Sequence, residues 1–178
     1  MNNKLIETAL NCGAFKATIL PAAEIKTGRE FRDICKSNQC GNYGRCWTCP
    51  PDCGDIDVLM AKLKEYDSVL LYQTVGELED SFDIEGMEDA HKKHLKVTMA
   101  IGDEVKTLLD VPYLQLSAGA CGICEVCAKR TGEPCRFPDK ALTSLEACGI
   151  NVYETVKNTG LKYINGQNTV TYFGAVFF

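Results

Sequence analysis

The sequence predicts a mixed fold of helices and strands, α/β or α+β, built as a single mixed-sheet sandwich. Short apolar runs typical of strands alternate along the chain with segments whose apolar residues recur every three or four positions. With 178 residues, the chain can bury the core of one domain, residues 1–178, without help from metal. Two cysteine-rich loops, residues 35–54 and 119–136, interrupt this pattern and are predicted to bind metal.

The first part of the chain is expected to contain two strands and two helices. Residues 14–21 alternate and indicate a strand, whereas residues 27–36 have helical spacing. Asp55 is a typical N-cap residue, and an apolar stripe that includes Val58 follows it, which predicts a short helix. Residues 68–75, with Val-Leu-Leu-Tyr at their centre, indicate a buried strand.

The second part predicts further alternation of helix and strand. A long helix is expected over residues 87–109, a strand over residues 113–118 and another helix over residues 138–148. Residues 161–164 and 169–178 look like two strands joined by a polar hairpin turn. The last of these strands is apolar, so we expect it to be central in the sheet.

The composition indicates a folded, soluble protein. Hydrophobic residues make up 46% and charged residues 24% of the chain, which is ordinary for a globular protein. The formal net charge of -5 argues against nucleic acid as a partner. No stretch approaches a membrane span and no secretory signal is evident, so we expect a cytoplasmic location and no membrane contact. Nothing in the sequence predicts an oligomeric state.

Nine of the eleven cysteines fall into the two loops. They are Cys35, Cys40, Cys46, Cys49 and Cys53 in the front loop, and Cys121, Cys124, Cys127 and Cys135 in the second loop. A reducing cytosol and an odd total disfavour a disulfide framework. We therefore interpret all nine as candidate ligands of a metal or cofactor.

The second loop has the spacing of an iron-sulfur site. Its cysteines read Cys-x2-Cys-x2-Cys-x7-Cys, so three thiolates can wrap around three corners of a 4Fe-4S cube and Cys135 can take the fourth. Zinc is the alternative, although it usually uses two Cys-x2-Cys pairs with a longer linker. Gly119 and Gly122 would let the backbone approach the sulfides, and Lys129 and Arg136 would raise the reduction potential.

The front loop has five cysteines for four positions. We favour Cys35, Cys40 and Cys49 as ligands, with Cys46 and Cys53 as competitors for the fourth position. A site with only three thiolates would leave one iron open to a substrate. The sequence therefore also allows an enzyme in which that iron acts as a Lewis acid.

Several residues outside the ligand set have simpler interpretations. Trp47 is expected to shield the front site from water. Cys12 and Cys148 stand apart and are expected to be small buried apolar residues. His91 and His94 lie three apart on the long helix, where they are either a solvated pair or metal ligands. With only these two histidines, the chain offers little material for a Cys-His or Ser-His-Asp hydrolase.

An acidic run precedes and enters the long helix. It surrounds Phe82 and Met87 with carboxylates, namely Asp80, Asp83, Glu85, Glu88 and Asp89. A solvated surface is the simplest interpretation. The alternative is a docking surface for a basic redox partner protein, because complementary charge steers transient electron-transfer complexes.

A set of short motifs resembles a known group of proteins. The motifs are Cys35-x4-Cys40-Gly-Asn-Tyr-Gly-Arg, Cys49-Pro-Pro, Glu79-Asp-Ser-Phe-Asp, Cys121-x2-Cys-x2-Cys, Gly132-Glu-Pro-Cys-Arg-Phe-Pro and Gly160-Leu-Lys-Tyr-Ile-Asn-Gly-Gln-Asn-Thr-Val-Thr-Tyr. Together, over about residues 19–178, they resemble the predicted metal-binding proteins, a family of unknown function common in anaerobic bacteria and archaea.

The resemblance implies metal binding in an anaerobic, cytoplasmic setting, and it implies no particular reaction. Cys35, Cys40 and Cys49 match the front motif of the family, whereas Cys46 and Cys53 look like positions at which other members need not have cysteine. Our leading hypothesis is an iron-sulfur protein with two 4Fe-4S clusters that transfers electrons to or from a partner enzyme. The alternatives are a zinc-binding structural or metal-handling protein and an enzyme with an open cluster iron at the front site.

Overall fold

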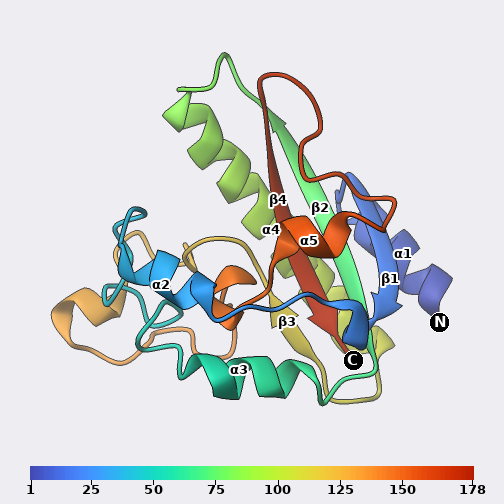
Figure 1. Cartoon of the computed structure of the whole chain (residues 1–178), viewed down its shortest axis with the longest axis horizontal. Helices are drawn as coiled ribbons and strands as arrows, with labels where there is room; N and C mark the ends of the chain where they lie inside the picture. Colours follow the sequence, from blue (N-terminus) through green and yellow to red (C-terminus); the bar gives the residue numbers. More distant parts are fainter.

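One four-stranded sheet forms the centre of the computed structural model, which describes all of residues 1–178 (Figure 1). The strands lie in the order β1-β2-β4-β3 and every pair of neighbours is antiparallel. Their bounds are β1 Lys16–Pro21, β2 Ser68–Glu77, β3 Leu114–Leu116 and β4 Thr169–Phe177. As expected, the last strand is central, since it lies between β2 and β3.

Five α-helices and three short 3-10 helices complete the fold. The α-helices are α1 Asn2–Asn11, α2 Glu30–Lys36, α3 Ile56–Leu63, α4 Ile84–Leu108 and α5 Val152–Val156. The 3-10 helices are η1 Ala22–Glu24, η2 Ala128–Thr131 and η3 Glu146–Cys148. None of the helices combines the length and the apolar composition that a membrane span needs.

The predicted class of mixed helix and strand is confirmed, and the antiparallel sheet selects the α+β form. The mixed strand directions expected of the sheet are not found among its four strands. The one parallel pairing is an isolated bridge between Ser117 and Ser144, outside the named strands.

The apolar run in β2 reflects burial of the sheet on both faces. Along this strand, Val69 and Leu71 enter one hydrophobic cluster, whereas Leu70 and Tyr72 enter the other. Side chains of a strand point alternately to the two faces, so a strand covered on both sides is apolar at successive positions. Helices α1 and α4 cover the Leu70 face, and α5, with segments around α3 and η3, covers the opposite face (Figure 1).

Two predicted helices begin where a capping residue precedes them. The Asp55 carboxylate accepts hydrogen bonds from the backbone of Asp57 and Val58 at 2.9 and 3.3 Å, which confirms the expected N-cap of α3. Val58 itself is 66% exposed, so the apolar stripe expected there is only partly buried. Asp83 caps α4 through the amide of Gly86, and the helix therefore starts three residues earlier than predicted.

Two predicted elements are wrong. Residues 138–148 form only η3 and turns, because Ser117 pairs with the backbone of Thr143 and Leu145 and draws that segment into an extended course. Residues 161–164 form no strand. Their backbone groups are bonded elsewhere, since the amide of Lys162 donates to the side chain of Gln73.

Candidate metal centre

The two cysteine loops lie side by side at one end of the sheet, at the left of Figure 1. The indole nitrogen of Trp47, in the front loop, donates to the carbonyl oxygen of Glu133 at 2.9 Å. The ammonium group of Lys129, in the second loop, pairs with Asp52 and lies 4.2 Å from the centre of the Trp47 ring. We call Trp47, Asp52 and Lys129 the loop clamp, because they join two segments about eighty residues apart.

Arg32 ties the front loop to the body of the protein. Its guanidinium group donates to the carbonyl oxygens of Gly54 at 2.9 Å and Ala147 at 3.2 Å, and one nitrogen lies 3.9 Å from the Cys53 sulfur. Arg32 stands three residues before Cys35, so one turn of α2 delivers both the cation and the first thiol. The motif analysis missed Arg32, although its position three residues before Cys35 could have identified it in the sequence.

Four thiols of the front loop influence one another and form the front set, Cys35, Cys40, Cys49 and Cys53. Burial raises the pKa of Cys35 and of Cys53, and the charge of Arg32 partly opposes this. The charge of Cys40 further raises the pKa of Cys35, and that of Cys35 raises the pKa of Cys53. Cys35, Cys40 and Cys49 line one cleft, and the guanidinium group of Arg32, one turn before Cys35 on α2, lies 3.9 Å from the Cys53 sulfur. The four thiols therefore lie in one region of the protein.

Cys46 lies between the front set and the second loop. Its sulfur is 3.3 Å from the hydroxyl oxygen of Thr48. A hydrogen bond with the Cys49 thiol lowers the pKa of Cys46 and raises that of Cys49, since one proton holds the pair together. Burial raises the pKa of Cys121, and the nearby Cys46 adds to the effect. The carbonyl oxygen of Cys46 accepts from the Cys49 amide at 3.0 Å, and the Cys46 side chain lines a pocket with Cys121. Cys46 thus lies where the two loops meet.

The second set consists of Cys121, Cys124, Cys127 and Cys135, which line one small pocket together with Cys46. Trp47 and Phe137 line the same pocket, so Trp47 lies against the thiols of the second set rather than shielding the front site as expected. Gly122 has a φ of +66°, and a Cβ atom there would lie 2.6 Å from Leu95 on α4. Glycine thus lets this loop pass directly against the helix.

The donors of both sets are thiols, and this soft donor type suits iron-sulfur clusters and zinc alike. No group of three or more His, Cys, Asp or Glu side chains has the arrangement that a single metal ion needs. In a 4Fe-4S cluster each thiolate binds a different iron.

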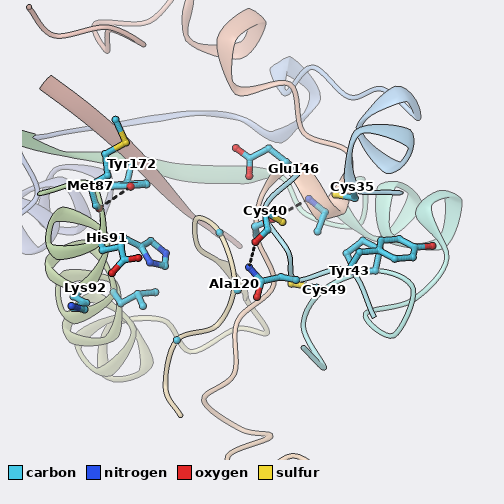
Figure 2. A pocket seen from close by; sticks show the side chains of 18 of the residues that line it. Cys35, Cys40, Tyr43, Cys49, Met87, His91, Lys92, Ala120, Glu146 and Tyr172 are labelled. Atoms are coloured by element: carbon cyan, nitrogen blue, oxygen red, sulfur yellow. Dashed lines mark hydrogen bonds between the residues drawn. The ribbon is translucent and has the colours of Figure 1, made fainter. Parts of the chain in front are cut away.

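A cleft of about 840 Å³ opens beside the front set. Figure 2 shows Cys35, Cys40 and Cys49 on one wall, and His91 from α4 with Tyr172 from β4 on the other. The carboxylate of Glu146 points into the space between these walls (Figure 2). Burial raises the pKa of Glu146.

The two histidines are not a solvated pair, which corrects the simpler expectation. His94 is fully buried, and its ring nitrogens lie 2.9 Å from the hydroxyl of Thr74 and 3.3 Å from that of Thr98. His91 is half-buried, and its Nε2 atom lies 2.8 Å from the carbonyl oxygen of Ala118. Both nitrogens of His94 are therefore engaged, whereas His91 faces the cleft.

Of the two isolated cysteines, Cys148 is buried as expected, whereas Cys12 is only partly buried. Cys148 is 2% exposed within a hydrophobic cluster, and burial raises its pKa to about 12. Cys12 is half-buried and packs against the cluster on the α4 side of the sheet.

The sequence had no pattern that could join Glu146 and Tyr172 to the cysteine loops, because these residues meet only through the fold.

Comparison with known proteins adds a family to this geometry. The sequence model of DUF2284, described as a predicted metal-binding protein, matches residues 18–178. The chain belongs to this family. The resemblance inferred from the motifs is thereby confirmed, and the DUF2284 match includes both cysteine loops and every wall of the cleft. Helix α1 lies outside the matched range. No curated protein and no solved structure matches the chain.

Proposed function

We propose that this protein is a cytoplasmic iron-sulfur protein with two 4Fe-4S clusters that transfers electrons to or from a partner protein. The observation that carries the proposal is the adjacency of two sets of four thiols. They are joined through Cys46, which accepts a hydrogen bond from the Cys49 amide and lines the pocket of the second set, and through the loop clamp. Two centres that close together suit the passage of single electrons. The family description, predicted metal-binding protein, supports the coarser part of this proposal.

The proposed ligands are Cys35, Cys40, Cys49 and Cys53 for the front cluster, and Cys121, Cys124, Cys127 and Cys135 for the second. Cys53 is preferred over Cys46 as the fourth front ligand for two reasons. The Cys53 thiol is a neighbour of Cys35 and faces the cation of Arg32. Cys46 instead lines the pocket of the second set.

When bound, the clusters would supply one-electron chemistry, and the chain's own residues would adjust it. Arg32 places a positive charge beside Cys35 and Cys53, which stabilises their thiolates and favours the reduced state of a nearby centre. Trp47 and Phe137 exclude water from the second pocket. Lys129 adds a cation close to both loops.

The surface that would receive a redox partner is the acidic run at the start of α4. Phe82 is 88% exposed and Ile84 is 67% exposed, and carboxylates stand on either side of them. Exposed apolar side chains within a charged surface are typical of transient protein contacts. Ile84 also lines the cleft, so a basic partner docked here would stand close to the front set.

A second candidate is an enzyme with an open iron at the front site, and the cleft favours it. Such an enzyme needs a substrate pocket beside Cys49, and the cleft has Cys49 in its wall. In this form Cys35, Cys40 and Cys49 would hold a cluster whose fourth iron faces the cleft. A zinc-binding structural or metal-handling protein is the remaining alternative.

The test is metal and acid-labile sulfide analysis after anaerobic purification. We expect about eight irons and eight sulfides per chain, as two cubes require, and a visible spectrum that dithionite bleaches reversibly. Cys124→Ser and Cys53→Ser should each retain about four irons. Cys12→Ser is the matched control, because this half-buried cysteine lies outside both sets, and it should retain about eight.

Zinc without sulfide in the wild-type protein would overturn the cluster proposal in favour of the metal-handling alternative. A Cys53→Ser protein with a full complement of iron would instead assign the fourth front position elsewhere. The companion variant Cys46→Ser then decides between a different thiol and an open iron. Loss of about four irons would identify Cys46 as the ligand, and full retention in both variants would favour the enzyme.

A further inference from the structure

The cleft has a wall that the proposed clusters do not use. Its volume of about 840 Å³ is within the range of small-molecule sites, roughly 300 to 1,000 Å³. Cys35, Cys40 and Cys49 of the front set occupy one side, whereas the side formed by α4 and β4 contains no cysteine (Figure 2). A metal centre held by the thiols leaves the opposite wall free to contact something else.

The charged groups around the cleft favour a cation. Three carboxylates line it, those of Glu88, Glu125 and Glu146, against one ammonium group, that of Lys92. Lys92 is itself paired with Asp89 at 3.0 Å. Thiolates at the metal wall would add further negative charge. An anionic ligand would therefore be repelled, and a positively charged one attracted.

Glu146 is the best-placed carboxylate to receive that cation. It is half-buried, it points into the cleft, and none of the ion pairs in the protein includes it. A carboxylate removed from water without a counter-charge is costly, and a ligand ammonium group would relieve that cost.

The opposite wall offers a second acceptor and a flat apolar surface. The Nε2 atom of His91 faces the carbonyl oxygen of Ala118, which can only accept, so the proton of the neutral ring is on Nε2 and Nδ1 is an acceptor. Nδ1 has no partner within the protein. The rings of His91 and Tyr172 lie 5.3 Å apart, and Met87 stands beside them.

We propose that this cleft binds a small organic amine, with its ammonium group on the Glu146 carboxylate and its carbon skeleton against His91 and Tyr172. The inference rests on the proposed function only in assuming that the thiol wall holds a metal centre. It extends that function by giving the front site a ligand, either as the substrate of the open-iron form or as a regulator of electron transfer.

The experiment is calorimetric titration of the anaerobically purified protein, whose iron, zinc and sulfide contents are measured beforehand. The probes are butylamine and benzylamine, compared with butyrate and benzoate of matched size. We expect the amines to bind and the acids not to bind. Glu146→Gln should weaken benzylamine binding roughly tenfold to a hundredfold, the value of one charge-assisted hydrogen bond. Glu104→Gln, an equal charge change at an exposed position far along α4, should leave it unchanged.

Acids that bind as tightly as amines, an absence of amine binding, or unaltered binding by Glu146→Gln would each overturn the amine site. These results are separate from the test of the clusters. A zinc-loaded protein that binds amines through Glu146 would uphold the cleft and overturn the iron-sulfur proposal. A protein with eight irons and no preference for amines would do the reverse.

Discussion

His94 is a polar residue placed where the core requires apolar ones. Its ring lies between β2 and α4, and the hydroxyls of Thr74 and Thr98 satisfy both of its nitrogens. The network continues inward, because the Tyr72 hydroxyl donates to Thr98 at 3.2 Å and the Gln115 amide donates to the Thr98 carbonyl at 2.7 Å. Burial lowers the pKa of His94 to about 3, and the nearby His91 contributes.

This low pKa predicts a loss of stability in acid. An unfolded histidine binds a proton near pH 6.5, whereas folded His94 stays neutral until about pH 3. Between these values the unfolded state binds the extra proton, so the free energy of unfolding should fall by about 1.4 kcal/mol per pH unit as pH decreases. Above pH 6.5 this contribution is fully present.

Urea unfolding at a series of pH values checks the effect. His94→Gln keeps an amide in the place of the ring and does not titrate, so its stability should decline less steeply between pH 6.5 and pH 3. The variant is expected to have a lower free energy of unfolding at neutral pH. The comparison therefore concerns the slope of stability against pH, not its absolute value. Parallel curves for the two proteins would contradict the assignment of this proton to His94.

At the scale of elements, the second loop depends on its fit against α4. Gly122 brings the backbone against Leu95, and Gly119 brings it within reach of His91. Both glycines have a positive φ, close to +65°. A loop that presents three cysteines in seven residues has little freedom left, so its position depends on the helix behind it.

Gly122→Ala should therefore weaken the proposed second cluster site. The alanine Cβ would lie 2.6 Å from Leu95, and overpacking of this kind costs about 1 to 3 kcal/mol beyond the strain of a left-handed residue. The rate of iron loss to a chelator measures the effect. Gly132→Ala is the control, because Gly132 has a φ of +75° with open space around it.

A second variant separates the steric effect from backbone strain. Leu95→Ala removes the methyl group that a Cβ atom at position 122 would meet, so the double variant should lose iron at the rate of the Gly132→Ala control. If Leu95→Ala gives no rescue, or if both glycine variants lose iron equally fast, contact with α4 is not what holds the loop.

The elements that sequence analysis predicted well are those whose signal is local. The buried run of β2, the Asp55 cap and the long helix α4 depend on neighbouring residues, and they were found. Residues 138–148 looked helical because the pairing of Ser117 with Ser144 is not visible locally. Helix α1 was missed, although Leu5 and Ala9 are buried at helical spacing.

The candidate site also divides into features with a local sequence signal and features that only the fold creates. The cysteines that the sequence groups by spacing can be recognised locally, because the ligands proposed for each centre lie on one short segment. Their metal binding stays a prediction. The cleft was not predictable, since Glu146, His91 and Tyr172 come from three separate parts of the chain. Only the antiparallel sheet and the packing of α4 bring them together.

At the scale of the whole molecule, the loop clamp makes one site from two distant segments. The side chains of Lys129 and Asp52 are only 24% and 16% exposed, and Trp47 lies beside the ammonium group. Lys129 pairs with Oδ1 of Asp52, and the second carboxylate oxygen, Oδ2, is buried without a hydrogen-bond partner in the protein. Removal of Lys129 would leave a largely buried charge uncompensated.

Lys129→Met should therefore loosen both loops together. Methionine keeps the length and apolar contact of the lysine stem but breaks the ion pair with Asp52. Hydrogen exchange should speed up in residues 44–54 and in residues 121–135, although only the second segment contains the substitution. The double variant with Asp52→Asn removes the stranded charge, so it should recover about 1 to 3 kcal/mol relative to additive losses.

Lys140→Met is the matched control, because Lys140 is an exposed lysine near the second loop that forms no ion pair. It should leave exchange in both loops at the wild-type rate. Faster exchange confined to residues 121–135 in Lys129→Met would mean that the loops are held independently. The two proposed centres would then lack the fixed separation that electron transfer between them requires.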